Sequence, residues 1–158
     1  MNSHHTVAIG TWEGDKQQSI EYNSSIAVGI DCPRAKLRVS ILLDTIQEYQ
    51  VRYIFSDEEI SEAVNEAGLI IGARGIAYEG VLQRKPVIVV GEYGFGGLVT
   101  PDTLHEQYNN YFRGKINGIK AEYFSLARLE EEIKRGFALT FQELQMMSNQ
   151  TIRFLHNI

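Results

Sequence analysis

Short apolar runs alternate with amphipathic segments along this chain. The runs are rich in β-branched residues and lie near residues 6–12, 26–30, 51–55, 69–72 and 86–91. Runs of this length, bounded by polar residues or glycine, are typical of buried strands. Strands that alternate with helices of about ten residues form parallel sheets covered on both faces. The pattern therefore predicts an α/β fold, a Rossmann-like three-layer sandwich whose mostly parallel sheet has about five or six strands.

The segments between the apolar runs carry helix start signals. Ser56 and Glu59 form a capping-box pattern, and apolar residues follow at helical spacing. An earlier helix is predicted to start with Asp31 as its N-cap, and Pro33 fits this start because proline is tolerated in the first turn. Ser125 predicts the N-cap of a later helix. These signals place helices between the predicted strands.

The remaining segments bear on domain organisation. At 158 residues the chain is expected to form one domain, residues 1–158. Residues 17–25 fit either a short helix or an extended connection, and residues 101–120 are interpreted as a long surface segment with one helical turn. Residues 121–158 are interpreted as the C-terminal helical segment of the same domain.

Composition and charge exclude several classes of protein. A net charge of −5 and an isoelectric point near 5.4 disfavour nucleic-acid binding and attraction to anionic membranes. No apolar run approaches the roughly 20 residues that span a bilayer, and the N-terminus lacks the features of a signal peptide. The single cysteine fits a reducing compartment. We therefore expect a cytoplasmic protein with no nucleic-acid partner and no membrane span.

The first candidate site is the turn from Gly72 to Gly75, which leads directly into a predicted helix. Glycine allows close approach of a ligand to the backbone, and free N–H groups at a helix N-terminus favour phosphate. Arg74 is placed to bind the same anion in a bidentate manner. Glu79, one turn later, is placed to accept hydrogen bonds from two ribose hydroxyls. The alternative is that the helix dipole favours Glu79 and that Arg74 is its surface partner.

The second candidate site is the glycine-rich stretch that follows the last predicted strand. It contains Gly94, Phe95, Gly96 and Gly97. A loop so rich in glycine is costly to order, so it is expected to bind a ligand through backbone N–H groups or to move on binding. The alternative is a tight structural turn. The stretch is neither a Walker loop nor a dinucleotide-binding fingerprint.

Other chemistry-bearing residues give weaker signals. The four histidines show no metal-ligand spacing, and no Asp-x-Asp pair suggests a divalent cation site. We therefore expect no bound metal and no cofactor, and the sequence identifies no catalytic residue.

The two candidate sites lie within a run that resembles a known family. The run from Ala67 to Gly91, AGLIIGARGIAYEGVLQRKPVIVVG, is similar to the C-terminal, donor-binding half of GT-B-fold glycosyltransferases. Those enzymes share an aliphatic strand, a small-residue turn, a glutamate, a short helix, Gly-Lys-Pro-Val-Ile and a glycine loop. Gly68 stands where the family usually has Asp, and Arg84 stands where it usually has Gly. The resemblance covers roughly residues 50–100 well and the rest only loosely.

The resemblance implies roles for specific residues. It implies that Glu79 contacts the ribose of a nucleotide sugar, and that Arg74, Gly75 and the stretch Gly94–Gly97 lie near its diphosphate and sugar. It also implies that the loop carrying Thr11 and Lys16 faces the cleft, and that the backbone of Phe55 and Ser56 contacts the base. The expected donor site therefore comprises Glu79, Arg74, Gly75, Gly94, Phe95, Gly96, Gly97, Thr11, Lys16 and Ser56.

The same resemblance implies an activity. The chain would bind the nucleotide sugar that donates a sugar to an unknown acceptor, without a metal, and an N-terminal acceptor-binding domain absent from these residues would complete the enzyme. UDP-sugar epimerases share the fold and a similar glutamate, so half of an epimerase-like enzyme is one alternative. A stand-alone module that binds a nucleotide or nucleotide sugar is the other.

Overall fold

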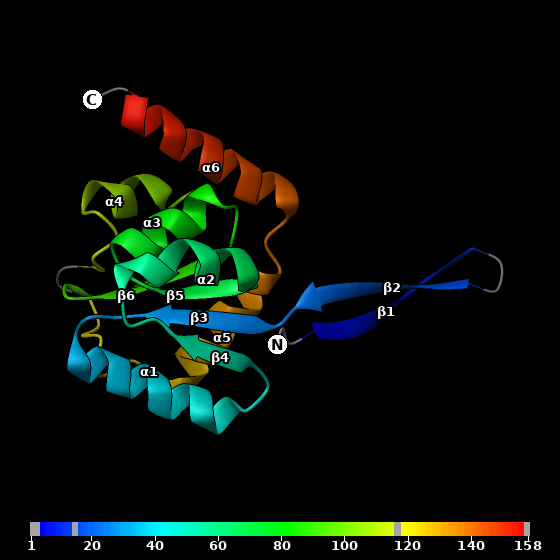
Figure 1. The fold of residues 1–158 in the computed structure, drawn as a ribbon, viewed down its shortest axis with the longest axis horizontal. Coiled ribbons are helices and arrows are strands. Elements are labelled where there is room, and N and C mark those ends of the chain that lie inside the picture. The colour runs from blue at the N-terminus through cyan, green and yellow to red at the C-terminus, as the bar shows by residue number, and fades with distance from the viewer. Residues whose placement is uncertain (1–3, 14–15, 116–117, 157–158) are drawn as a thin grey trace.

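The computed structural model describes residues 4–13, 16–115 and 118–156, and it describes residues 4–13 and 16–22 by their backbone. Figure 1 shows two parts, a layered α/β body and a hairpin that projects from it. The body contains a five-stranded sheet, and the hairpin is a separate two-stranded sheet. The predicted α/β class and mostly parallel sheet are confirmed.

The five-stranded sheet has the order β4-β3-β5-β6-β7, with β7 antiparallel to β6 and the other pairs parallel. Its strands are β3 (Ser25–Gly29), β4 (Gln50–Tyr53), β5 (Leu69–Gly72), β6 (Val87–Gly91) and β7 (Gly94–Leu98). Strands β5 and β6 are buried at every position. Continuous apolar strands of this kind form where helices cover both faces of a parallel sheet.

Helices cover both faces of the sheet and make the three layers (Figure 1). One face packs against α1 (Pro33–Ile46) and α5 (Leu126–Phe137). The other packs against α2 (Ile60–Glu66), α3 (Gly75–Leu82), α4 (Leu104–Asn109) and α6 (Phe141–His156). Alternate residues of one strand therefore belong to different cores: Ile71 faces the α1 side and Ile70 faces the α3 side. None of the helices in the described residues combines the length and apolar character needed to cross a membrane.

The predicted helix starts are found with small changes. A 3₁₀ turn at Asp57–Glu59 precedes α2, and Glu59 Oε2 accepts from the Phe55 N–H at 3.1 Å and the Ser56 N–H at 3.2 Å. The hydrogen bond from the Phe55 N–H is the main cause that lowers the pKa of Glu59. Ser125 Oγ accepts from Arg128 N at 3.1 Å, which confirms that cap. Helix α1 begins at Pro33, but its N-cap is Cys32 and not Asp31.

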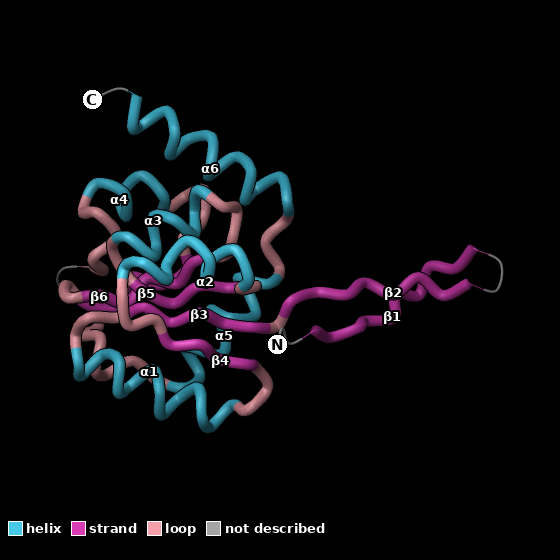
Figure 2. The backbone as a smooth tube through the Cα atoms, viewed as in Figure 1, coloured by secondary structure: helices cyan, strands magenta, loops and turns pink. Residues whose placement is uncertain are grey.

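The first predicted strand does not belong to the main sheet. It forms β1 (His4–Glu13), which pairs antiparallel with β2 (Lys16–Asn23) in the hairpin. Residues 17–25 therefore follow the extended alternative. A β-rich apolar run predicts a strand but not its partner, and here the nearest partner in sequence is the next strand. Figure 2 shows the hairpin leaving the body where β3 begins, at the amino edge of the main sheet.

Candidate functional site

The topology of the sheet opens a crevice at its carboxyl edge. The chain runs from β3 through α1 to β4 on one side, and α2 then carries it back past β3 to β5. Because the crossovers on the two sides of β3 go in opposite directions, β3 and β5 flank a topological switch point, which is where open α/β sheets bind ligands. Asp31 follows β3 closely, and Arg74 follows β5.

Two adjoining pockets lie at this edge. The first, here called the switch-point pocket, has a volume of about 300 Å³ and is lined by Ile30, Asp31, Cys32, Ala73, Arg74, Gly91, Glu92 and Arg113. The second, here called the β4-side pocket, has a volume of about 350 Å³, and its lining includes Ile54, Ser56, Asp57 and Gly75. Asp31, Ala73 and Arg74 line both pockets. The two pockets together form one extended depression across the ends of the strands.

Arg74 has an unusual backbone at the junction of β5 and α3. Its φ of 57° and ψ of −126° lie in a region that favours glycine. The surrounding structure fixes this conformation, because the Arg74 N–H donates to Phe112 O at 3.0 Å and its carbonyl accepts from Tyr78 N at 2.9 Å. Such a conformation costs about 1–3 kcal/mol and clusters at functional sites. In this conformation Arg74 is exposed, and it lines both pockets.

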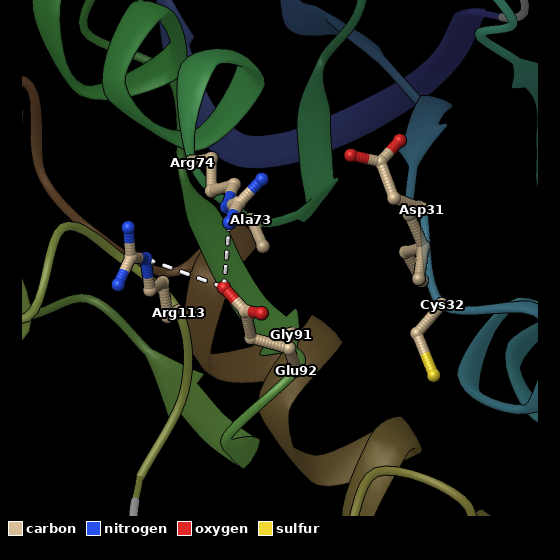
Figure 3. A pocket seen from close by; sticks show the side chains of 8 residues that line it. Asp31, Cys32, Ala73, Arg74, Gly91, Glu92 and Arg113 are labelled. Carbon is tan, nitrogen blue, oxygen red and sulfur yellow. Dashed lines mark hydrogen bonds and ion pairs between the residues drawn. The ribbon is translucent and has the colours of Figure 1, made fainter.

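Two guanidinium groups meet one carboxylate in the switch-point pocket (Figure 3). Arg74 Nη2 lies 2.8 Å from Glu92 Oε1, and Arg113 Nε lies 3.3 Å from the same oxygen. Arg113 Nη1 also donates to the Tyr93 hydroxyl at 3.0 Å, and this bond is the main cause that raises the pKa of Arg113. Asp31 and Cys32 form the opposite wall in Figure 3. The pocket therefore has a cationic wall and an acidic wall.

A tight turn in residues 110–114 brings Arg113 to the site. Asn110 Nδ2 donates to Gly114 O at 2.7 Å, and Asn110 Oδ1 accepts from Arg113 N at 3.3 Å. The Tyr93 N–H donates to Arg113 O at 2.8 Å, which ties the turn to the segment after β6. Gly114 has a φ of +102°, and a Cβ there would lie 2.1 Å from Gly94 O. The position of Arg113 therefore depends on close contact between two backbone segments.

The glycine-rich stretch that was predicted to be a ligand-binding loop forms strand β7 instead. Phe95 is 5% exposed and stacks on Phe124 with 4.7 Å between ring centroids. Gly96 O accepts from Gln107 Nε2 at 3.2 Å, and a Cβ at Gly97 would lie 2.7 Å from Glu132 Oε1. Close packing against these groups explains the glycines without a ligand. A donor-binding role for Gly94, Phe95, Gly96 and Gly97 stays a prediction.

Glu79 lies on α3 and lines neither of the two pockets. Its Oε2 accepts from Gln83 Nε2 at 2.8 Å, and the same amide nitrogen lies 3.3 Å from Ser61 O on α2. Arg74 pairs with Glu92 and not with Glu79, so the predicted surface pair is not found. The ribose role of Glu79 stays a prediction.

Ser56 and Gly75 both line the β4-side pocket. Two residues of one donor site should lie close together in this way. The N–H and the hydroxyl of Ser56 are directed at Glu59 Oε2, at 3.2 and 3.3 Å. Gly75 is the first residue of α3, and a Cβ there would meet only Ile60 Cδ1, at 3.9 Å. The backbone at Gly75 is therefore open toward the pocket.

The structure does not bring Thr11 and Lys16 to the crevice, which corrects their predicted place. Both lie in the hairpin, and β2 runs from Lys16 to Asn23, just before the amino end of β3. At about 3.3 Å per residue, eight extended residues place Lys16 roughly 23 Å from Asn23. The hairpin thus extends from the sheet edge opposite the pockets (Figure 2).

Several residues of the pockets were not among the predicted donor-site residues. Asp31, Glu92 and Asp57 each follow closely after a strand, so their position at a carboxyl edge was the available signal. Arg113 had no such signal, because it comes from a polar and aromatic segment far along the chain. Within residues 4–13, 16–115 and 118–156, no group of three or more His, Cys, Asp or Glu side chains could hold a metal ion.

Comparison with known proteins does not assign this chain to a family. No protein-family model, no curated protein and no solved structure matches it. The function must therefore be argued from the geometry of the crevice.

Proposed function

We propose that this chain binds the diphosphate of a nucleotide sugar in the switch-point pocket, as the donor-binding half of a glycosyltransferase. The observation that carries the proposal is the convergence of Arg74 and Arg113 in the switch-point pocket, beside the start of α3, whose first residue lines the adjoining β4-side pocket. Guanidinium groups bind phosphate oxygens with strong, directed hydrogen bonds, and a helix N-terminus adds free N–H donors. The likeness of residues 67–91 to GT-B donor domains supports the same assignment.

The same groups would assist transfer. When the bond between the sugar and the diphosphate breaks, the electron pair stays on the leaving diphosphate. The oxygen of an acceptor hydroxyl forms the new bond to the sugar, and the hydroxyl proton passes to a base or to the leaving diphosphate. Charge therefore grows on the phosphate oxygens, where preorganised cations are most effective. The acceptor would be held by a further domain that these residues do not include.

The β4-side pocket would hold the nucleoside. Two carboxylates are then candidates for the ribose hydroxyls: Glu79, from the resemblance, and Asp31, which lines both pockets. Glu79 would have to release Gln83 to reach a ribose. The loss of one charge-assisted hydrogen bond weakens binding by about 1.5–3 kcal/mol, so Glu79→Gln and Asp31→Asn separate the two assignments.

A nucleotide screen tests the proposal. UDP, GDP, ADP and CDP are screened by thermal shift, since a ligand that binds the native state raises its apparent stability. Isothermal titration then compares the wild type with Arg74→Gln, which should weaken binding at least about tenfold because a guanidinium–phosphate contact is lost. Arg128→Gln is the matched control, since Arg128 is similarly exposed but lies on α5. If no nucleotide binds, or if both variants lose affinity equally, the proposal is wrong.

A further inference from the structure

We infer that Glu92 is an internal competitor for this site: its carboxylate occupies the anion position between Arg74 and Arg113 and must leave before a diphosphate binds. The inference rests on the proposed function, because it concerns the same two guanidinium groups. It assigns Glu92 a role in affinity and selectivity and not in the transfer itself.

The first support is the way in which Glu92 holds both cations. A single oxygen, Oε1, lies 2.8 Å from Arg74 Nη2 and 3.3 Å from Arg113 Nε. The two arginines come from segments on either side of Glu92 in the sequence, and their guanidinium groups face the carboxylate from two sides (Figure 3). This is the arrangement in which two arginines bind a ligand anion.

The second support is that Glu92 satisfies Arg113 incompletely. The Nε atom of Arg113 is buried and has no hydrogen-bond partner among the described residues, although Glu92 Oε1 lies nearby. A buried donor without a partner is costly and needs an acceptor in native structures. A diphosphate offers more oxygens than a carboxylate and at several positions, so it could bond to both guanidinium groups at once.

The third support is that Glu92 can leave without disturbing the fold. It occupies the two-residue turn between β6 and β7, and its side chain is 46% exposed. The neighbouring residue Tyr93 is anchored, because its N–H bonds to Arg113 O and its hydroxyl bonds to Arg113 Nη1. A rotation of the Glu92 side chain would therefore clear the site while the turn and Arg113 stay in place.

Competition of this kind lowers the apparent affinity for every anion. It also means that an anion binds only if its contacts with the two arginines are strong enough to displace the Glu92 carboxylate. A ligand binds only to the fraction of molecules in which Glu92 has left, so its apparent dissociation constant equals the intrinsic constant divided by that fraction. A weakly charged anion gains too little from the two arginines to displace the carboxylate. A diphosphate makes more contacts, so the site should favour diphosphates over monophosphates.

The experiment is an isothermal titration with inorganic pyrophosphate and, separately, with uridine. Glu92→Gln keeps the shape of the side chain and removes its charge. One exposed ion pair changes an equilibrium constant by no more than roughly fivefold. Loss of the two ion pairs of Glu92 therefore predicts that the variant binds pyrophosphate roughly three- to tenfold more tightly than the wild type. Uridine carries no phosphate, and its affinity should not change.

Glu66→Gln is the matched control. Glu66 is 49% exposed, and its Oε2 lies 3.2 Å from Arg52 Nη1 at the end of α2. The substitution removes the same charge, but away from the pocket, so pyrophosphate affinity should stay at the wild-type value.

The possible results are distinct. Tighter pyrophosphate binding by Glu92→Gln alone supports the inference, including the case in which only this variant binds measurably. Equal or weaker binding by Glu92→Gln overturns the inference and leaves the proposed function standing. An equal gain in Glu66→Gln, or a gain for uridine, also overturns it, because the effect would then be general. If no protein binds pyrophosphate, both the inference and the proposed diphosphate site fail.

Discussion

The turn after β5 and the segment after β6 have related sequences, Gly-Ala-Arg-Gly and Gly-Phe-Gly-Gly, but they differ in their surroundings. After β5, Gly75 is exposed, and a Cβ there would meet nothing closer than 3.9 Å. After β6, Gly94 is buried with a φ of +127°, and a Cβ would lie 2.7 Å from Ile119 O. Glycine at the first position leaves room for a ligand, whereas glycine at the second lets two backbone segments touch. The density of glycine in a sequence does not separate these two uses.

The largest expected effect comes from Gly94→Ala in β7. The new Cβ would press on backbone atoms that cannot move easily, and the backbone would keep a positive φ. We expect the free energy of unfolding to fall by about 2–4 kcal/mol, as for other strained or overpacked positions. Urea denaturation followed by circular dichroism measures the change.

Gly75→Ala is the partner measurement, since its Cβ enters open space. We expect a change in unfolding free energy within about 0.5 kcal/mol of zero. The new methyl group would narrow the β4-side pocket, so it should weaken nucleotide binding without loss of stability. Equal destabilisation by Gly75→Ala and Gly94→Ala would contradict the contrast between the two segments.

A smaller effect, of opposite sign, is expected from Arg74→Gly. Glycine accepts the φ of 57° and ψ of −126° without strain. The strain relieved, about 1–3 kcal/mol, exceeds the extra chain entropy of glycine and the loss of an exposed ion pair. We therefore expect the free energy of unfolding to rise by about 1 kcal/mol while pyrophosphate binding is lost.

Arg74→Ala separates the two contributions in the same pair of measurements. Alanine removes the guanidinium but retains a Cβ in the strained conformation, so binding should fall without a gain in stability. Loss of stability in Arg74→Gly would show that the side-chain contacts of Arg74 outweigh its backbone strain.

The parts of the fold that depend on local chemistry were predictable from the sequence. Ser125 caps α5 and Pro33 starts α1 because a cap needs only neighbours within a few residues. Strands β3, β5 and β6 were recognisable because burial on both faces makes them continuously apolar.

The parts that depend on distant partners were not predictable. Strand β7 has glycine at three of its five positions, and it is held as a strand by its pairing with β6, by the packing of Phe95 on Phe124 and by the hydrogen bond from the Leu98 N–H to Glu132 Oε1. Likewise, nothing in the sequence near Arg113 indicates that its guanidinium would reach Glu92. The candidate site was therefore found in outline, through Arg74, but without its second cation.

The smallest expected effect, Arg84→Gly, tests whether strain alone marks a functional position. Arg84 has a φ of 61°, and it stands where the GT-B pattern has glycine, but it follows α3 at the end opposite Gly75. Replacement by glycine should raise the free energy of unfolding by about 0.5–1 kcal/mol and leave pyrophosphate binding unchanged. Arg84→Ala retains a Cβ and should bring no gain. If Arg84→Gly also weakened pyrophosphate binding, a positive φ would no longer distinguish Arg74 from a residue outside the two pockets, and only the contacts among Arg74, Arg113 and Glu92 would support the site.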